Sequence, residues 1–146
     1  MKRKLTAVLA LSILGAAGAF AGKGGPVAAG DWEGSGQAIY MDGTTAEIIV
    51  DFVTIFQEGN FVYGNSQFTV KVGDGDPQEL PGISLSGYIH GNVLKGTFGF
   101  CMSVAPPDCV GAAIFEGRIA GNTLSGIAVD LSDGSTSVVT LHRIAD

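Results

Sequence analysis

The stretch "GYIHGNVLKG" (87–96) returns thirty positions later as "GRIAGNTLSG" (117–126), and both copies read Gly-x-Ile-x-Gly-Asn-x-Leu-x-Gly. A Gly-Asn pair between two short runs of strand-forming residues is typical of a two-residue type II′ turn, in which Gly takes the positive φ of the first turn position. Each copy therefore predicts a β-hairpin, and "EGNFVYG" (58–64) is a third, less regular copy. In the predicted register four pairs of residues face each other across the two hairpins: Ile89 and Leu94, Gly87 and Gly96, Ile119 and Leu124, and Gly117 and Gly126.

Further turn signals divide the rest of the chain. They are Asp42-Gly43, "GDGDP" (73–77), "APPD" (105–108) and Asp133-Gly134. Between the signals lie eight candidate strands, at 32–41, 45–57, 60–72, 80–90, 93–104, 109–120, 123–131 and 135–144. Most alternate with period two and are rich in β-branched and aromatic residues. Strands joined in order by short turns form a meander, and closure removes its exposed edges. We predict a single eight-stranded antiparallel up-and-down β-barrel, with a two-sheet β-sandwich as the alternative.

Alternate turns of such a barrel lie at opposite ends. The Gly-Asn turns (59–60, 91–92 and 121–122) then share one end with both chain termini. The opposite rim is acidic and carries Asp42, Asp74, Asp76, Asp108 and Asp133.

The first residues are typical of a secretory signal peptide. Lys2, Arg3 and Lys4 precede an apolar run that ends in "AFA" (19–21), the small-x-small spacing of a cleavage site. An uncleaved membrane anchor is the alternative, but the apolar run is shorter than the ~20 residues of a spanning helix. No Cys stands directly after the cleavage site, which disfavours a lipoprotein. We expect a signal peptide at 1–21, a flexible lead-in at 22–30 and a barrel domain at 31–146, exported to the periplasm or the exterior.

The charge of the mature chain excludes some partners. Cleavage leaves five basic residues against fourteen acidic ones, a net charge near −9. Such a surface repels nucleic acid and anionic lipid, so we expect neither as a partner. No apolar stretch of the mature chain is long enough for a membrane helix.

The chain contains two cysteines, Cys101 and Cys109. In an exported protein they predict one disulfide that closes the loop "CMSVAPPDC". A redox or metal pair is the alternative, but it lacks the C-x-x-C spacing and a neighbouring His.

Catalytic groups are sparse. The two histidines, His90 and His142, stand apart in sequence, and no known nucleophile, zinc or phosphate-binding motif is present. We predict a non-enzymatic protein without a cofactor. "GDGDPQE" brings Asp74, Asp76 and Glu79 close enough to suggest calcium, but it lacks the EF-hand pattern, and Asp and Gly are also what tight turns use.

The lumen is the better candidate for a site. If the aliphatic hairpin pairs point inward, so do Phe98, Phe100, Phe115 and Ala128, and Val62, Phe68 and Val70 extend that lining. On the second strand, Ile48, Val50, Phe52 and Phe56 form the more apolar face, which matches the third strand only through a three-residue turn or a bulge at 58–60. The inward glycines have no side chains and so leave space beside the barrel wall. Either other side chains or a small apolar ligand fills that space. The candidate lumen residues are Trp32, Phe98, Phe100, Phe115, Gly87, Gly96, Gly117 and Gly126.

Residues at the two ends of the predicted domain resemble those of a known family. Gly30-Asp31-Trp32 opens the first strand and Arg143 closes the last, which resembles the calycin barrels: lipocalins, fatty-acid-binding proteins and avidins. The resemblance implies the barrel fold and a floor where Arg143 packs on Trp32. The chain departs from lipocalins in lacking a helix candidate after the barrel, and from avidins in having a single Trp.

These observations favour a binding module that holds a small hydrophobic molecule in its lumen. One alternative is a solid-cored structural or protein-interaction barrel, with Phe61 and Tyr63 exposed on its outer wall. Another is a small outer-membrane barrel, which the strand number, strand length and export signal suit. The polar outward set on the third strand (Asn65, Gln67, Thr69 and Lys71) and the lack of a terminal aromatic residue disfavour it.

Overall fold

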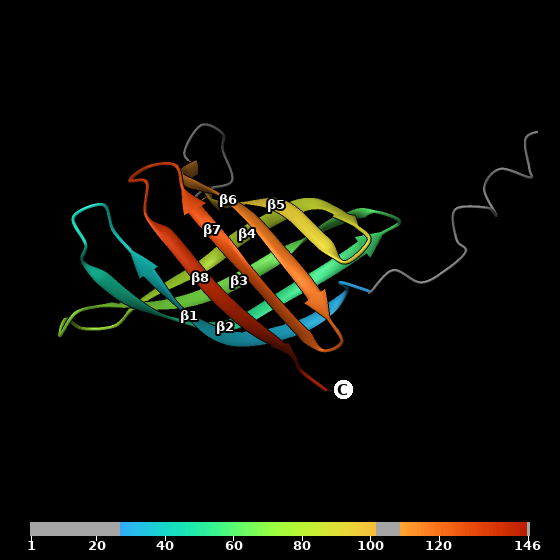
Figure 1. Ribbon diagram of the computed structural model, residues 1–146, viewed down its shortest axis with the longest axis horizontal. Coiled ribbons are helices and arrows are strands. Elements are labelled where there is room, and N and C mark those ends of the chain that lie inside the picture. The colour runs from blue at the N-terminus through green and yellow to red at the C-terminus, as the bar shows by residue number, and fades with distance from the viewer. Residues whose placement is uncertain (1–26, 102–108, 146) are drawn as a thin grey trace, which may run out of the picture.

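The protein is an eight-stranded closed β-barrel, seen in a computed structural model that describes residues 27–101 and 109–145 (Figure 1). The strands are β1 (Gly30–Ile39), β2 (Thr45–Glu58), β3 (Phe61–Val72), β4 (Gln78–His90), β5 (Val93–Cys101), β6 (Cys109–Ala120), β7 (Thr123–Asp130) and β8 (Thr136–Arg143). Each pairs antiparallel with the next, so the predicted meander barrel is confirmed and the two-sheet alternative is not. The predicted signal peptide and the loop between the cysteines lie outside the described residues.

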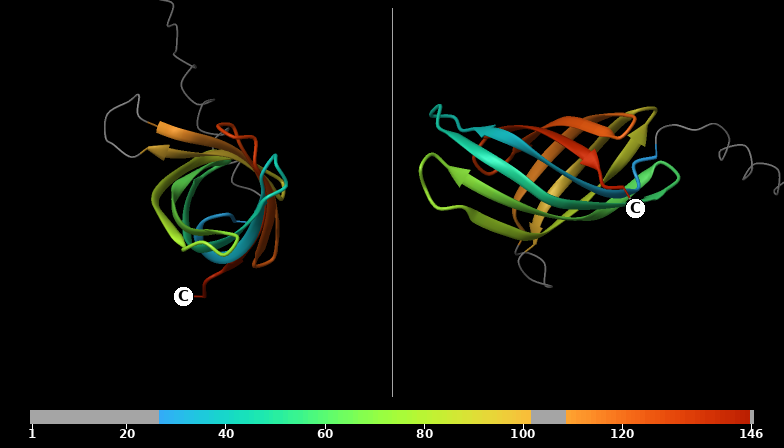
Figure 2. Two further views of the ribbon diagram at one scale, coloured as in Figure 1. Left: turned by 90° about the vertical axis from the view of Figure 1, so that its left-hand side faces the viewer. Right: turned by 90° about the horizontal axis from the view of Figure 1, so that it is seen from below.

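β1 and β8 close the barrel. Their pairing runs without interruption from Trp32 opposite Arg143 to Ile39 opposite Thr136. Seen along its length, the barrel is a ring of strands (Figure 2, left). Within the described part of the chain, no helix has the length and apolar character needed to cross a membrane.

The Gly-Asn turns lie at one end, which we call the floor. Gly59, Gly91 and Gly121 have φ values of 61°, 58° and 60°, the positive φ that the turn signal predicts. Each turn is also tied to a later strand through its Asn carbonyl. These bonds are Ile89 N to Asn60 O at 2.8 Å, Ile119 N to Asn92 O at 2.8 Å and Arg143 N to Asn122 O at 2.9 Å.

The repeated frame thus does two jobs in each copy. Its Gly-Asn pair makes a turn, and its Ile donates an amide hydrogen bond to the carbonyl of the preceding Gly-Asn turn. Because Ile89 and Ile119 hold the same place in the two copies, the same frame is used each time one hairpin joins the previous one.

β2 differs from the sequence expectation. The pairing of β2 with β3 shifts between Val50 and Phe52, so a bulge lies in the middle of the strand and not at 58–60. Before it Ile48 and Val50 are buried, and after it Val53 and Ile55 take their place. The expected grouping of Phe52 and Phe56 with Ile48 and Val50 was therefore wrong, since these two rings are 37% and 50% exposed on the outer wall.

The inward side chains form one hydrophobic core. The predicted inward residues Val62, Ile89, Leu94, Phe115, Ile119 and Leu124 are all buried, with Phe68, Val70, Phe98 and Ala128 packed against them. The polar Ser66 is also buried on this face, and its hydroxyl donates to the carbonyl of Ile83 at 3.1 Å.

Candidate functional site: the barrel lumen

Trp32 and Arg143 seal the floor. Trp32 is fully buried, and the guanidinium carbon of Arg143 lies 4.2 Å from the centroid of its ring. The indole N–H donates to the carbonyl of Ala28 at 2.9 Å, while the two terminal nitrogens of Arg143 donate to the carbonyls of Ala29 and Val27. The short segment before β1 is therefore held under the barrel, where Ala28 is fully buried.

Above the floor lies a cavity of about 270 Å³. Its wall is apolar over most of its depth and reaches the opposite rim at the turn between β7 and β8. Trp32 does not line it, so the indole closes the bottom of the barrel and is not part of the ligand-sized space. Of the other candidate lumen residues, Gly87, Gly96, Phe98 and Phe115 line the cavity. The side chain of Phe100 lies outside the described part.

Three aromatic rings, those of Phe68, Phe98 and Phe115, line the cavity and contact one another. Phe98 contacts Phe68 with ring centroids 6.0 Å apart and Phe115 with centroids 5.3 Å apart, both edge to face. This geometry is the favourable one for aromatic pairs. It leaves ring faces and edges available as an apolar platform beside the cavity.

The two glycine pairs have different surroundings. A Cβ on Gly117 or Gly126 would lie 2.6 Å from the ring of Phe115, so this pair is covered by that ring. Gly87 and Gly96 line the cavity, and a Cβ on Gly87 would collide with the carbonyl oxygen of Lys95 on β5. The glycine-lined wall expected at both pairs is therefore present only at Gly87 and Gly96.

Polar groups gather where the cavity meets the rim. They are Tyr40, Gln78, Asp130, Asp133, Ser135 and Ser137. Asp130 Oδ1 accepts hydrogen bonds from the amide of Ser132 at 2.8 Å and from its hydroxyl at 2.5 Å, and Asp133 Oδ1 accepts from the amide of Ser135 at 2.8 Å. The hydrogen bonds from Ser135 lower the pKa of Asp133 below its ordinary value of 3.8. The mouth thus presents carboxylates and hydroxyls.

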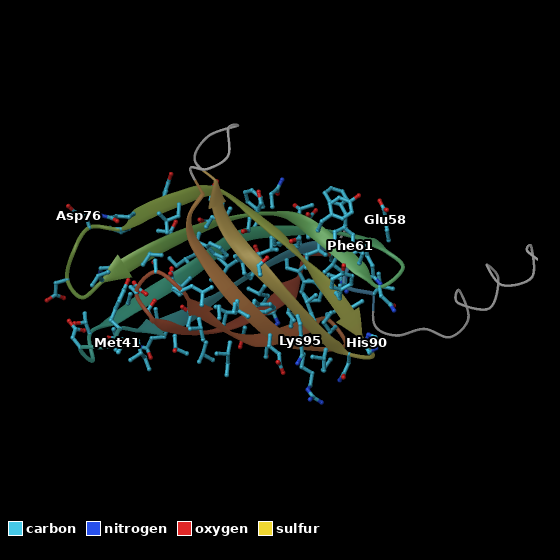
Figure 3. All side chains as sticks on the ribbon, turned by 90° about the horizontal axis from the view of Figure 1, so that it is seen from above. Met41, Glu58, Phe61, Asp76, His90 and Lys95 are labelled. Carbon is cyan, nitrogen blue, oxygen red and sulfur yellow. The ribbon has the colours of Figure 1, made fainter. Side chains whose placement is uncertain are left out.

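The candidate metal ligands do not form a site. Asp74, Asp76 and Glu79 are exposed around the turn between β3 and β4, and the described residues contain no group of three or more His, Cys, Asp or Glu side chains placed to hold a metal. The histidines do not line the cavity. Figure 3 shows His90 at the end that carries Glu58 and Phe61, far from Met41 and Asp76 at the rim.

The cysteines face each other along the backbone. Cys101 at the end of β5 is the pairing partner of Cys109 at the start of β6. Their side chains and the loop between them lie outside the described residues, so the disulfide stays a prediction.

The outer wall carries an aromatic cluster that sequence reasoning found only in part. Phe61 contacts Tyr63 at 5.6 Å and Tyr88 at 5.6 Å, and Tyr63 stacks on Phe56 at 5.5 Å. Phe61 and Tyr63 were expected to be exposed, and Phe56 and Tyr88 join them. Tyr88 could have been found, because it occupies the outward position between Gly87 and Ile89 in the repeated frame.

Comparisons with known proteins support the fold. No family model matches the chain, and no curated protein does. Among solved structures it is similar to a redesigned β-barrel, mFAP1, bound to DFHBI, with 15% identity and a TM-score of 0.53 over 79% of this chain and 94% of that one. A second similar structure is fatty-acid-binding protein 1 of Echinococcus granulosus, with 11% identity and a TM-score of 0.36 over 81% of this chain and 98% of that one. The similarity to the redesigned barrel shows the fold alone, a closed eight-stranded β-barrel.

Proposed function

We propose that the protein is an exported, non-catalytic binding module that holds one small, largely apolar molecule in its lumen. The observation that carries this proposal is the cavity of about 270 Å³ above a sealed floor. Ligand pockets in proteins typically span about 300–1,000 Å³, so the volume suits a molecule at the small end of that range.

The composition of the wall explains why such a molecule would bind. Burial of apolar surface contributes roughly 25 cal/mol per Å², and the wall offers aliphatic side chains and the rings of Phe68, Phe98 and Phe115. The redesigned barrel with a similar fold is bound to DFHBI, which supports the use of this architecture for binding. The apolar lumen also argues against the outer-membrane alternative, because membrane barrels have polar interiors.

The test is a titration with 2-naphthylmethanol, a neutral probe that reports binding by its fluorescence. Ala128→Leu adds three carbons to the cavity wall, so we expect the probe to bind at least about tenfold more weakly. The matched control is Ala120→Leu, because Ala120 is exposed on the same barrel and should change affinity less than about twofold. Absence of saturable binding to the wild type, or equal affinity in both variants, would contradict the proposal.

A second candidate function is contact with a partner through the outer wall. The aromatic cluster of Phe56, Phe61, Tyr63 and Tyr88 favours it, because exposed aromatic groups are enriched in interfaces. Sedimentation velocity tests the simplest partner, a second copy of the chain. Concentration-dependent association that Tyr88→Ser abolishes would support this function, and a monomer throughout would count against self-association.

A further inference from the structure

The charges at the cavity all have one sign. Asp130 and Asp133 are the charged residues that line it within the described part of the chain. Asp130 is half-buried at the end of β7, where the lumen opens, and Asp133 follows in the turn. The hydrogen bonds from Ser132 and from the amide of Ser135 go to Oδ1 of each carboxylate, and a carboxylate has about four lone-pair sites, so both groups keep acceptor capacity for a ligand.

The described basic residues lie elsewhere. Lys95 reaches Glu116 on the outer wall at 3.0 Å and points away from the barrel (Figure 3), and Arg118 is exposed on β6. Arg143 is engaged beneath Trp32 by two backbone carbonyls. Lys71 is exposed near the rim and does not line the cavity.

The rim adds more negative charge. Asp42, Asp74 and Asp76 lie in its exposed turns. Charge of a single sign around a low-dielectric opening raises the local concentration of counter-ions and repels ions of the same sign. A carboxylate ligand would therefore meet repulsion at the mouth, and none of the described residues that line the cavity is basic and could offset it.

We propose that the lumen selects a ligand with an apolar body and a cationic head, an organic ammonium, and disfavours carboxylates. This inference rests on the proposed function. The body packs against the rings of Phe68, Phe98 and Phe115, while the ammonium lies at the mouth between the carboxylates of Asp130 and Asp133. The hydroxyls of Ser135 and Ser137 at the mouth accept its remaining hydrogen bonds.

The experiment compares three probes that share one ring system: 2-naphthylmethylammonium, 2-naphthylmethanol and 2-naphthoate. Calorimetric titration at pH 7 and low salt should rank them in that order, with the ammonium bound at least about tenfold more tightly than the carboxylate. Asp130→Asn/Asp133→Asn should bring these two affinities to within about threefold, because the ammonium loses its counter-charges and the carboxylate no longer meets repulsion. The control Asp74→Asn/Asp76→Asn changes rim charge outside the cavity and should preserve the wild-type ranking.

The outcomes separate the two proposals. If the alcohol binds but the carboxylate binds as tightly as the ammonium, the charge selectivity is wrong and the binding function stands. If no probe binds, both fail. The wild-type ranking alone decides the selectivity should the Asp130→Asn/Asp133→Asn variant prove poorly folded.

Discussion

Replacement of Arg143 by Ala should open the floor of the barrel. The guanidinium carbon lies 4.2 Å from the centroid of the Trp32 ring, and a cation in that position contributes about 0.5–2 kcal/mol. The variant also loses the hydrogen bonds to Val27 and Ala29, and hydrogen bonds of a charged group are worth about 1.5–3 kcal/mol each. Arg143 is only half-buried, so a discount applies to all three contacts. We expect the free energy of unfolding to fall by about 2–4 kcal/mol.

Urea unfolding followed by tryptophan fluorescence measures this loss of unfolding free energy, with a fluorescent group that is itself part of the floor. Trp32 is the single Trp of the chain and is fully buried, so its emission reports the floor directly. With a urea dependence of about 1–3 kcal/mol per molar for a domain of this size, a loss of about 2–4 kcal/mol should lower the midpoint by about 0.7–4 M. The emission of the folded variant should also shift to longer wavelength, because water reaches the indole.

Two variants control the experiment. Arg118→Ala removes an exposed Arg from β6 and should change the free energy of unfolding by less than about 0.5 kcal/mol. Arg143→Lys keeps the charge but not the planar fork that reaches two carbonyls, so its stability should lie between wild type and Arg143→Ala. Equal midpoints for Arg143→Ala and Arg118→Ala would refute the role assigned to the floor contact.

Three further results are expected. Gly87→Ala should lose about 1–3 kcal/mol in thermal unfolding, because its Cβ meets the β5 backbone, whereas Ser86→Ala on the exposed face of the same strand should lose less than about 0.5 kcal/mol. The pKa of Asp133 in the folded protein lies below 3.8, so its charged form stabilises the fold above pH 3.8, and this stabilisation is lost as the pH falls through the folded-state pKa. The difference in the free energy of unfolding between wild type and Asp133→Asn should therefore shrink in unfolding curves recorded below pH 3.8. A difference that stays constant would contradict this linkage. Intact mass after alkylation should show Cys101 and Cys109 unlabelled before reduction, and reduction should cost about 2–3 kcal/mol of stability.

The turns were accessible from the sequence because their signals are local, and closure followed because a meander of eight strands removes its exposed edges by closing. A type II′ turn requires a positive φ at its first position, which Gly adopts without steric cost, and the structure has a Gly with positive φ at all three turns. The bulge in β2 was not accessible. Phe52 and Val53 are both apolar, so the alternation reads equally well in either phase, and the curvature of the closing sheet decides which of the two turns inward.

The different fates of the glycine pairs have a cause outside the repeated frame. The residue two positions before the frame points to the same face in both copies, and it is Leu85 in the first copy and Phe115 in the second. The longer, flat ring of Phe115 covers Gly117 and Gly126, whereas the first pair remains part of the cavity wall. A frame of identical glycines can therefore line a cavity or seat a side chain, and the sequence decides between these outcomes at a position that the repeat does not include.

The asymmetry of the two ends determines how a lumen ligand would exchange. At the floor, each Gly-Asn turn is bonded through its Asn carbonyl to a later strand, and the indole of Trp32 closes the opening with Arg143 packed against its ring. Passage there would require several of these contacts to break together. The rim turns instead carry exposed Asp residues, and the cavity reaches the surface beside Asp133. Any ligand must then pass the same carboxylates that select it, so the rim charge governs the association rate of a cationic ligand as well as its affinity, and added salt should slow its association more than that of a neutral one.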